Sequence, residues 1–175
     1  MVLSKMLKQA GRVLPVLLSL VLVACTVSYK FTGASIDYTK VKTISLTQFQ
    51  NRAPYQWAPM ATMLNDALND AFVQQTKLQQ VSRNGDLQLD GEITAYDQFN
   101  KSTSSDGYSS LVQLKLTVNV RFTNNTNHDE DFERSFSATR DFDATQSLDS
   151  VQEDLVSQMI TEIVDAIFNA AVANW

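Results

Sequence analysis

The stretch Val112-Gln-Leu-Lys-Leu-Thr-Val-Asn-Val-Arg-Phe122 alternates strictly between apolar and polar side chains. A period of two places the apolar side chains on one face of a β-strand and the polar ones on the other. The polar set is Gln113, Lys115, Thr117, Asn119 and Arg121. The pattern predicts the central strand of a half-buried sheet, with one face in the core and the other uncovered.

Four further segments have the composition of strands. Val41–Phe49 is rich in β-branched residues, Leu78–Val81 ends at the turn signal Asn84-Gly85, and Phe132–Asp143 follows the polar turn at 124–131. In Asp86–Tyr96 we expect two faces. The first holds Leu87, Leu89, Ile93 and Ala95, and the second holds Gln88, Asp90, Glu92, Thr94 and Tyr96. In Phe132–Asp143 the arginines Arg134 and Arg140 share the parity of the apolar residues, so this strand is less cleanly two-faced.

Two segments have the period of an amphipathic helix. The first follows Pro59, a residue that suits an early helical position. Its apolar stripe is Met60, Met63, Leu64, Ala67, Leu68, Ala71 and Phe72. The second is a long C-terminal helix, for which Ser150 and Glu153 have the spacing of a capping box. Its stripe runs from Leu148 to Val172 and includes Met159, Ile163 and Ile167.

Strands grouped between two helices favour an α+β fold. We expect a two-layer sandwich, with two helices packed on one face of a largely antiparallel β-sheet of about four to five strands. The chain divides into a signal segment (1–24), a tether leading into the domain (25–40) and a single α+β domain (41–175).

The N-terminus has the features of a lipoprotein signal peptide. Lys5, Lys8 and Arg12 precede an apolar run at 13–23, which is too short to span a bilayer. The segment Leu22-Val23-Ala24-Cys25 resembles a bacterial lipobox, in which the cysteine is acylated and becomes the first mature residue. An ordinary secreted protein with one buried thiol is the alternative. Lipidation explains why an exported chain has one unpaired cysteine.

The charge of the mature chain excludes some partners. Residues 25–175 hold 11 basic residues against 19 acidic ones, a net charge of −8. Nucleic-acid binding needs clustered Lys and Arg, so we expect no nucleic-acid partner. Bulk charge will not hold the chain on anionic lipid either, so membrane attachment depends on the acyl chains, palmitate among them.

Few residues are suited to catalysis. His128, the only histidine, lies in a turn rich in Asn, Asp and Glu, and Asp129, Glu130 and Asp131 are adjacent rather than spaced as in a calcium loop. No glycine-rich phosphate loop occurs. We therefore expect no enzyme, no metal and no cofactor.

Two features are candidates for binding. The polar face of the central strand either faces water or docks against another polar wall. The polar loop 97–110, which includes Lys101, is longer than a hairpin needs and is either a binding element or simply flexible. The candidate partner-binding residues are Gln113, Lys115, Thr117, Asn119, Arg121 and Lys101.

Several stretches, in this order, resemble a divergent branch of the LptE family of lipopolysaccharide (LPS)-assembly lipoproteins. They are Tyr29-Lys-Phe-Thr-Gly-Ala-Ser-Ile36, Asn51-Arg-Ala-Pro54, Gly85-Asp-Leu-Gln-Leu-Asp-Gly-Glu-Ile93, Thr117-Val-Asn-Val-Arg-Phe122, Asp141-Phe-Asp-Ala144 and Ala171-Val-Ala-Asn-Trp175. The resemblance covers nearly the whole mature chain and includes no catalytic motif.

The resemblance implies a role in the biogenesis of the cell envelope. LptE-type proteins plug the LptD barrel and help LPS to reach the outer leaflet, so the expected partners are an LptD-like β-barrel and outer-membrane lipid, with LPS as a further candidate ligand. The basic residues that bind LPS in the family have no matching positions here. We expect a lipid anchor on the periplasmic side of the outer membrane. Alternatives are an envelope lipoprotein that carries an amphiphile between sheet and helices and, last, an envelope hydrolase.

Overall fold

The computed structural model describes residues 36–103 and 109–173 of the 175-residue chain. Its helices are α2 (Pro59–Gln75) and α3 (Leu148–Phe168), and the π turn η2 (Asn169–Ala173) continues α3. Its strands are β1 (Thr43–Leu46), β2 (Gln50–Asn51), β3 (Gln79–Gln80), β4 (Leu87–Thr103), β5 (Ser109–Asn124) and β6 (Phe132–Asp143), and the 3-10 helix η1 (His128–Glu130) lies between the last two. The signal segment and Cys25 lie outside the described residues.

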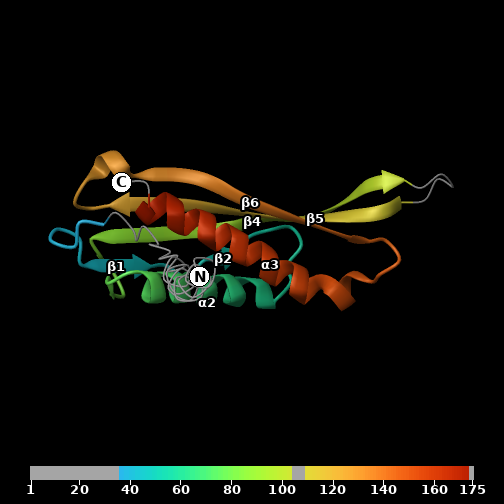
Figure 1. Ribbon diagram of the computed structural model, residues 1–175, viewed down its shortest axis with the longest axis horizontal. Coiled ribbons are helices and arrows are strands. Elements are labelled where there is room, and N and C mark those ends of the chain that lie inside the picture. Colours follow the sequence, from blue (N-terminus) through green and yellow to red (C-terminus); the bar gives the residue numbers. More distant parts are fainter. Residues whose placement is uncertain (1–35, 104–108, 174–175) are drawn as a thin grey trace, which may run out of the picture. The chain divides into compact units, whose positions relative to one another are not determined.

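The two helices lie on the same face of the sheet (Figure 1). They also pack against each other, since the rings of Phe72 on α2 and Phe168 on α3 have centroids 5.2 Å apart. α3 and η2 together are long and apolar enough to cross a bilayer, but their apolar stripe is buried in the core, as in a soluble domain. The predicted two-layer α+β sandwich is therefore confirmed.

The sheet is mixed and has six strands, rather than largely antiparallel with four to five. Its order is β3-β1-β4-β5-β6, and β2 also pairs with β4. β4, β5 and β6 are antiparallel, whereas β1 is parallel to both β3 and β4, and β2 is parallel to β4. The parallel pairs follow from α2, which carries the chain back to the same end of the sheet before β3 begins.

The segment predicted as one strand, Val41–Phe49, is interrupted. β1 ends at Leu46, and pairing resumes only in β2 at Gln50. Asn65 on α2 holds the intervening backbone: its Oδ1 accepts a hydrogen bond from the N–H of Phe49 at 2.8 Å, and its Nδ2 donates to the carbonyl of Phe49 at 3.0 Å. The break is therefore stabilised by the helix.

A β-bulge in β4 corrects the predicted faces of this strand. The register with β5 shifts between Ile93 and Ala95, so Tyr96 points into the core and Ala95 joins the polar face. The hydroxyl of Tyr96 accepts a hydrogen bond from Nε2 of the buried Gln152 on α3 at 3.1 Å. A bulge inserts one unpaired residue, which reverses the parity of everything that follows it.

The prediction of a long loop at 97–110 is wrong. β4 runs to Thr103 and β5 begins at Ser109, so most of the segment is paired strand. The hairpin reaches past the helices at one end of the sheet (Figure 1). Within the described residues no helix covers this hairpin, and it is held by the cross-strand ladder together with the ion pair between Lys101 and Asp141.

The start of α3 also differs from the prediction. Ser147, not Ser150, occupies the N-cap position, and the hydroxyl of Ser150 donates to the carbonyl of Ser147 at 2.7 Å from within the first turn. The proposed capping box of Ser150 and Glu153 is therefore wrong. The predicted start of α2 is confirmed, since Pro59 is its first residue.

Shortening the apolar side chains of α3 should destabilise the domain. Ile163 and Ile167 are 1% and 0% exposed. Ile163→Ala or Ile167→Ala should lower the free energy of unfolding by about 2–5 kcal/mol, since each leaves a cavity in the core. Urea denaturation measures the loss, and Asp165→Ala, on the exposed side of the same helix, is the control. Losses below about 1 kcal/mol at both isoleucines would contradict the assignment of this stripe to the core.

Gly91 should not tolerate a side chain. A Cβ there would lie 2.5 Å from Cε1 of the buried Phe49 ring and would also meet the carbonyl of Asn119. Gly91→Ala should lower the free energy of unfolding by about 1–3 kcal/mol through overpacking. Adding Phe49→Leu should recover part of this loss in a double-mutant cycle. Independent, additive losses would show that the ring and residue 91 do not compete for space.

Candidate docking surface

The face of the sheet opposite α2 and α3 is polar, and within the described residues no helix covers it (Figure 1). The predicted residues Gln113, Lys115, Thr117, Asn119 and Arg121 lie together on it, in alternation with the buried apolar residues of β5. The register adds neighbours on both sides: Gln88, Asp90, Glu92 and Asp97 from β4, and Glu133, Ser135, Ser137, Thr139 and Asp141 from β6. We call this set the polar sheet face.

Cross-strand bonds organise one end of this face. Nε of Arg121 donates to Oε2 of Glu133 at 3.2 Å, and Nδ2 of Asn119 donates to the other carboxylate oxygen at 3.2 Å. The hydroxyl of Ser135 in turn donates to Oδ1 of Asn119 at 3.4 Å. The hydrogen bond from Arg121, followed by that from Asn119, holds the pKa of Glu133 below its usual value.

A second cluster lies towards the hairpin. Lys101 forms an ion pair with Asp141, and Nε2 of Gln113 donates to the other oxygen of the same carboxylate at 2.8 Å. The hydrogen bond from Lys101, followed by that from Gln113, lowers the pKa of Asp141. Lys101 therefore joins the polar sheet face through the extended β4, not through a loop.

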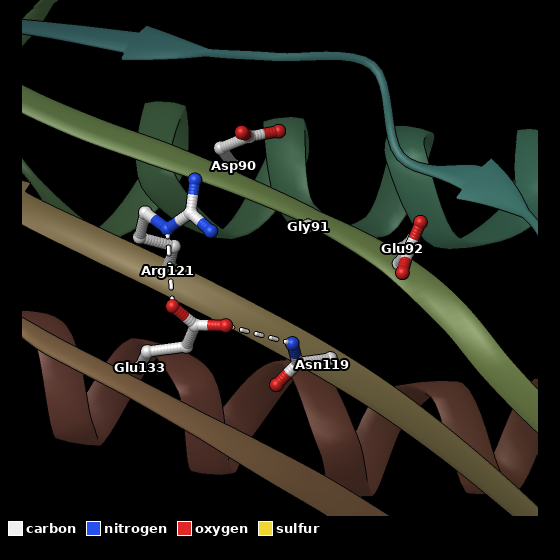
Figure 2. Close-up of a pocket in the computed structure, with 6 residues that line it drawn as sticks. All are labelled: Asp90, Gly91, Glu92, Asn119, Arg121 and Glu133. Carbon is white, nitrogen blue, oxygen red and sulfur yellow. Dashed lines mark hydrogen bonds and ion pairs between the residues drawn. The ribbon is translucent and has the colours of Figure 1, made fainter.

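The polar sheet face contains a shallow hollow of about 230 Å³, shown in Figure 2. Its lining is Asp90, Gly91, Glu92, Asn119, Arg121 and Glu133. The guanidinium of Arg121 extends from β5 towards β4, and the carboxylate of Glu133 reaches both Arg121 and Asn119. Gly91 lines the hollow with backbone alone, and a side chain at this position would point the other way, towards Phe49 in the core.

The charges of this face are unevenly paired. Arg121 and Lys101 each have a carboxylate partner within the chain. Across the described residues, the side chains of Asp90, Glu92, Asp97 and Lys115 take part in no hydrogen bond or ion pair. Unpaired charges on an exposed face are available to a partner, so these four positions complement the hydrogen-bonding groups around them.

Sequence reasoning identified the β5 residues but missed their acidic neighbours. Alternation placed Asp90 and Glu92 on one face of their strand without naming them as candidates, whereas the pairing of Glu133 with Arg121 depends on a register that the sequence does not reveal. His128 lies away from this face, exposed in η1, with Nδ1 3.0 Å from Oδ2 of Asp131. Across the parts that the structure describes, no group of three or more His, Cys, Asp or Glu residues could hold a metal ion.

Several solved structures have a similar fold, and two of them are described as lipoproteins. The chain resembles the solved structures of an uncharacterized lipoprotein B from Nitrosomonas europaea (15% identity, 73% of this chain and 79% of that one, TM-score 0.51) and of the rare lipoprotein B from Shewanella oneidensis (14%, 74% and 92%, 0.50). It also resembles a hypothetical protein from Chlamydia trachomatis (10%, 77% and 99%, 0.53). At these identities the likeness shows the fold alone.

No curated protein matches the chain in sequence. The model of the family described as LptE, lipopolysaccharide-assembly, matches residues 41–171, which include both helices and all six strands. This match covers well over half of the chain and agrees with the resemblance seen in the sequence. The chain belongs to the LptE family of lipopolysaccharide-assembly lipoproteins.

Proposed function

We propose that this protein is a non-enzymatic lipoprotein of the outer membrane that supports LPS delivery by plugging an LptD-type β-barrel. Family membership supports the role in LPS assembly. The polar sheet face supports the manner of docking. The inner wall of a membrane barrel is polar, so a plug must present hydrogen-bonding groups to it. An uncovered sheet of amides, hydroxyls and mixed charges meets this requirement.

The packing between the layers favours a plug over a lipid carrier. A carrier needs an apolar cavity between sheet and helices. Here the space is filled by side chains that are 0–1% exposed, from both layers: Leu89, Ile93, Leu116 and Val118 from the sheet, and Val156, Met159, Ile163 and Ile167 from α3. A filled core leaves the outer surface as the part of the domain that can bind.

The proposal includes no reaction. His128 is exposed, and its neighbour Asp131 accepts from it and directs a second carboxylate oxygen to the backbone N–H of Asn124 at 2.7 Å. These contacts stabilise the turn between β5 and β6. They do not place a nucleophile beside the imidazole, as an acid–base site would require.

Attachment to the membrane is assigned to Cys25. Acylation there, followed by cleavage of 1–24, would anchor the domain through a short tether. Two or three acyl chains hold a protein on a bilayer far more firmly than one, since each buried methylene contributes about 0.8 kcal/mol. The anchor then confines the domain to the membrane in which the barrel lies.

Removing the thiol should release the protein from the membrane. Cys25→Ser should abolish acylation and leave the chain unprocessed or soluble, since the lipobox requires the sulfur as acyl acceptor. Metabolic labelling with palmitate and fractionation of the envelope measure the two effects. Normal processing and outer-membrane fractionation of the variant would refute the lipoprotein assignment.

Reversing the cations of the polar sheet face should release the barrel. The double variant Lys115→Glu/Arg121→Glu should fold, because both side chains lie on the uncovered face. In the complex it would set two new anions against a wall that had met cations, so little barrel should co-purify. Photo-crosslinking residues at positions 113, 117 and 119 should capture one large outer-membrane protein.

A double reversal on the other layer controls for the effect of reversing surface charges in general. Asp66 on α2 and Asp165 on α3 are exposed on the helical side, so Asp66→Lys/Asp165→Lys should leave co-purification of the barrel unchanged. An unchanged barrel yield with the sheet variant, or crosslinks from the helical side alone, would show that the polar sheet face is merely solvated. Circular dichroism of both variants confirms that they fold.

A further inference from the structure

β6 is a 12-residue terminal strand that pairs with β5 over its whole length without a bulge. The direction in which the N–H and C=O groups of β6 point can be derived from hydrogen bonds on the other side of the sheet, where β4 meets the β1 and β2 region. The carbonyls of Leu89 and Ile93 accept hydrogen bonds from Thr47 and Arg52, so these β4 residues direct their backbone groups away from β5. The backbone N–H and C=O groups of Asp90 and Glu92 therefore point towards β5. The same alternation of backbone directions continues across the ladder to β6.

In β6, the even-numbered residues thus bond to β5, and the odd-numbered ones direct N–H and C=O away from the sheet. The contact of Arg140 agrees with this. Its Nη1 reaches around the edge to the carbonyl of Thr139 at 2.7 Å and to Oε2 of Glu162 on α3 at 2.8 Å. This arginine closes the edge at Thr139. Within the described residues, nothing pairs with the backbone edge of Glu133, Ser135 and Ser137.

An aromatic shelf lies beside the open part of this edge, on the helical side of the sheet. Phe132 and Phe136 are half-buried, with ring centroids 6.4 Å apart, and Phe132 stacks on Phe122 at 5.2 Å. The guanidinium of the exposed Arg134 lies 4.5 Å from the centroid of the Phe132 ring. Among the described carboxylates, none is within ion-pair distance of Arg134.

We infer that the edge of β6 from Phe132 to Ser137 accepts an extended strand from a partner polypeptide. Backbone bonds to Glu133, Ser135 and Ser137 would supply the pairing. Side chains that alternate along the added strand would meet the shelf: apolar residues opposite Phe132 and Phe136, and an acidic residue opposite Arg134. This chemistry differs from that of the polar sheet face, and the inference does not rest on the proposed function.

A second copy of the chain does not fit this edge. The open part of the edge, 132–137, can pair with a second copy about a two-fold axis through Arg134 or through Ser135. The first register sets Arg134 against its own copy, and the second sets it against Phe136 and gives it no acidic partner. Like charges directly opposite each other destabilise a sheet. The occupant is therefore a different polypeptide with an acid where β6 has Arg134.

A synthetic peptide tests the edge directly. The probe is acetyl-Thr-Val-Thr-Glu-Thr-Val-Thr-amide carrying a fluorophore, titrated with the full-length protein in detergent and followed by fluorescence anisotropy. Binding should appear at or below about 1 mM and should slow hydrogen exchange in residues 132–138. No binding at that concentration, or protection confined to another segment, would overturn the inference.

Two pairs of variants separate strand addition from charge attraction. Ser135→Pro removes an outward N–H that bonds to no other described group and should weaken binding about tenfold, whereas Ser135→Ala keeps the N–H and should bind as the native chain does. Arg134→Glu should weaken binding of the original probe. A second probe, with Lys in place of Glu, should bind this variant as the original probe binds the native chain.

A modified peptide tests the inference on the native protein, even if Ser135→Pro does not fold. A probe N-methylated at every residue has no backbone N–H to donate from either of its edges and should lose binding to the native protein. Equal binding of the methylated probe would overturn strand addition. Self-association of the native chain that Ser135→Pro abolishes would also overturn the inference, since it would identify a second copy as the occupant.

Discussion

The pairing of β5 on both of its edges is the constraint on which the rest of the structure depends. β4 and β6 bond to it along almost its full length, so its alternation sets which side of the sheet is apolar. The apolar side requires cover, and α2 and α3 supply it. The polar side requires none, and it is left as a surface of amides, hydroxyls and charges. One strand thus determines both the layer order and the position of the candidate docking surface.

The sequence predicted this framework because alternation and helical stripes are local patterns. Periodicity places β5, β6 and both helices correctly. The turn signal Asn84-Gly85 lies between β3 and β4, as expected. The errors have non-local causes. The bulge that moves Tyr96 into the core is accompanied by a hydrogen bond from Gln152 on a distant helix. The break before β2 is held by Asn65, and the polar part of β4 is strand because β5 pairs with it.

The candidate site was predictable to the same extent. Parity alone placed Gln113, Lys115, Thr117, Asn119 and Arg121 on one face. Their partners were not predictable, because Glu133 and Asp141 meet them only through the register between strands. That register matters for docking. Arg121 and Lys101 are held by carboxylates of the chain itself, so they are pre-positioned, while Asp90, Glu92 and Lys115 remain open to groups from outside.

The parallel pairing of β1 with β4 affects the order in which the domain forms. β4, β5 and β6 follow one another through short connections, so their antiparallel ladder joins neighbours in the chain. Ile44 instead meets Leu87 only after the whole of α2 has been looped out. Contacts of such sequence separation form late, since the loop must be closed before they stabilise anything. The break at Phe49 further ties this edge to the docking of Asn65. We therefore expect the folding chain to pass through a three-stranded intermediate whose β4 edge is unpaired. Docking of residues 41–75 then covers this edge and protects it from aggregation.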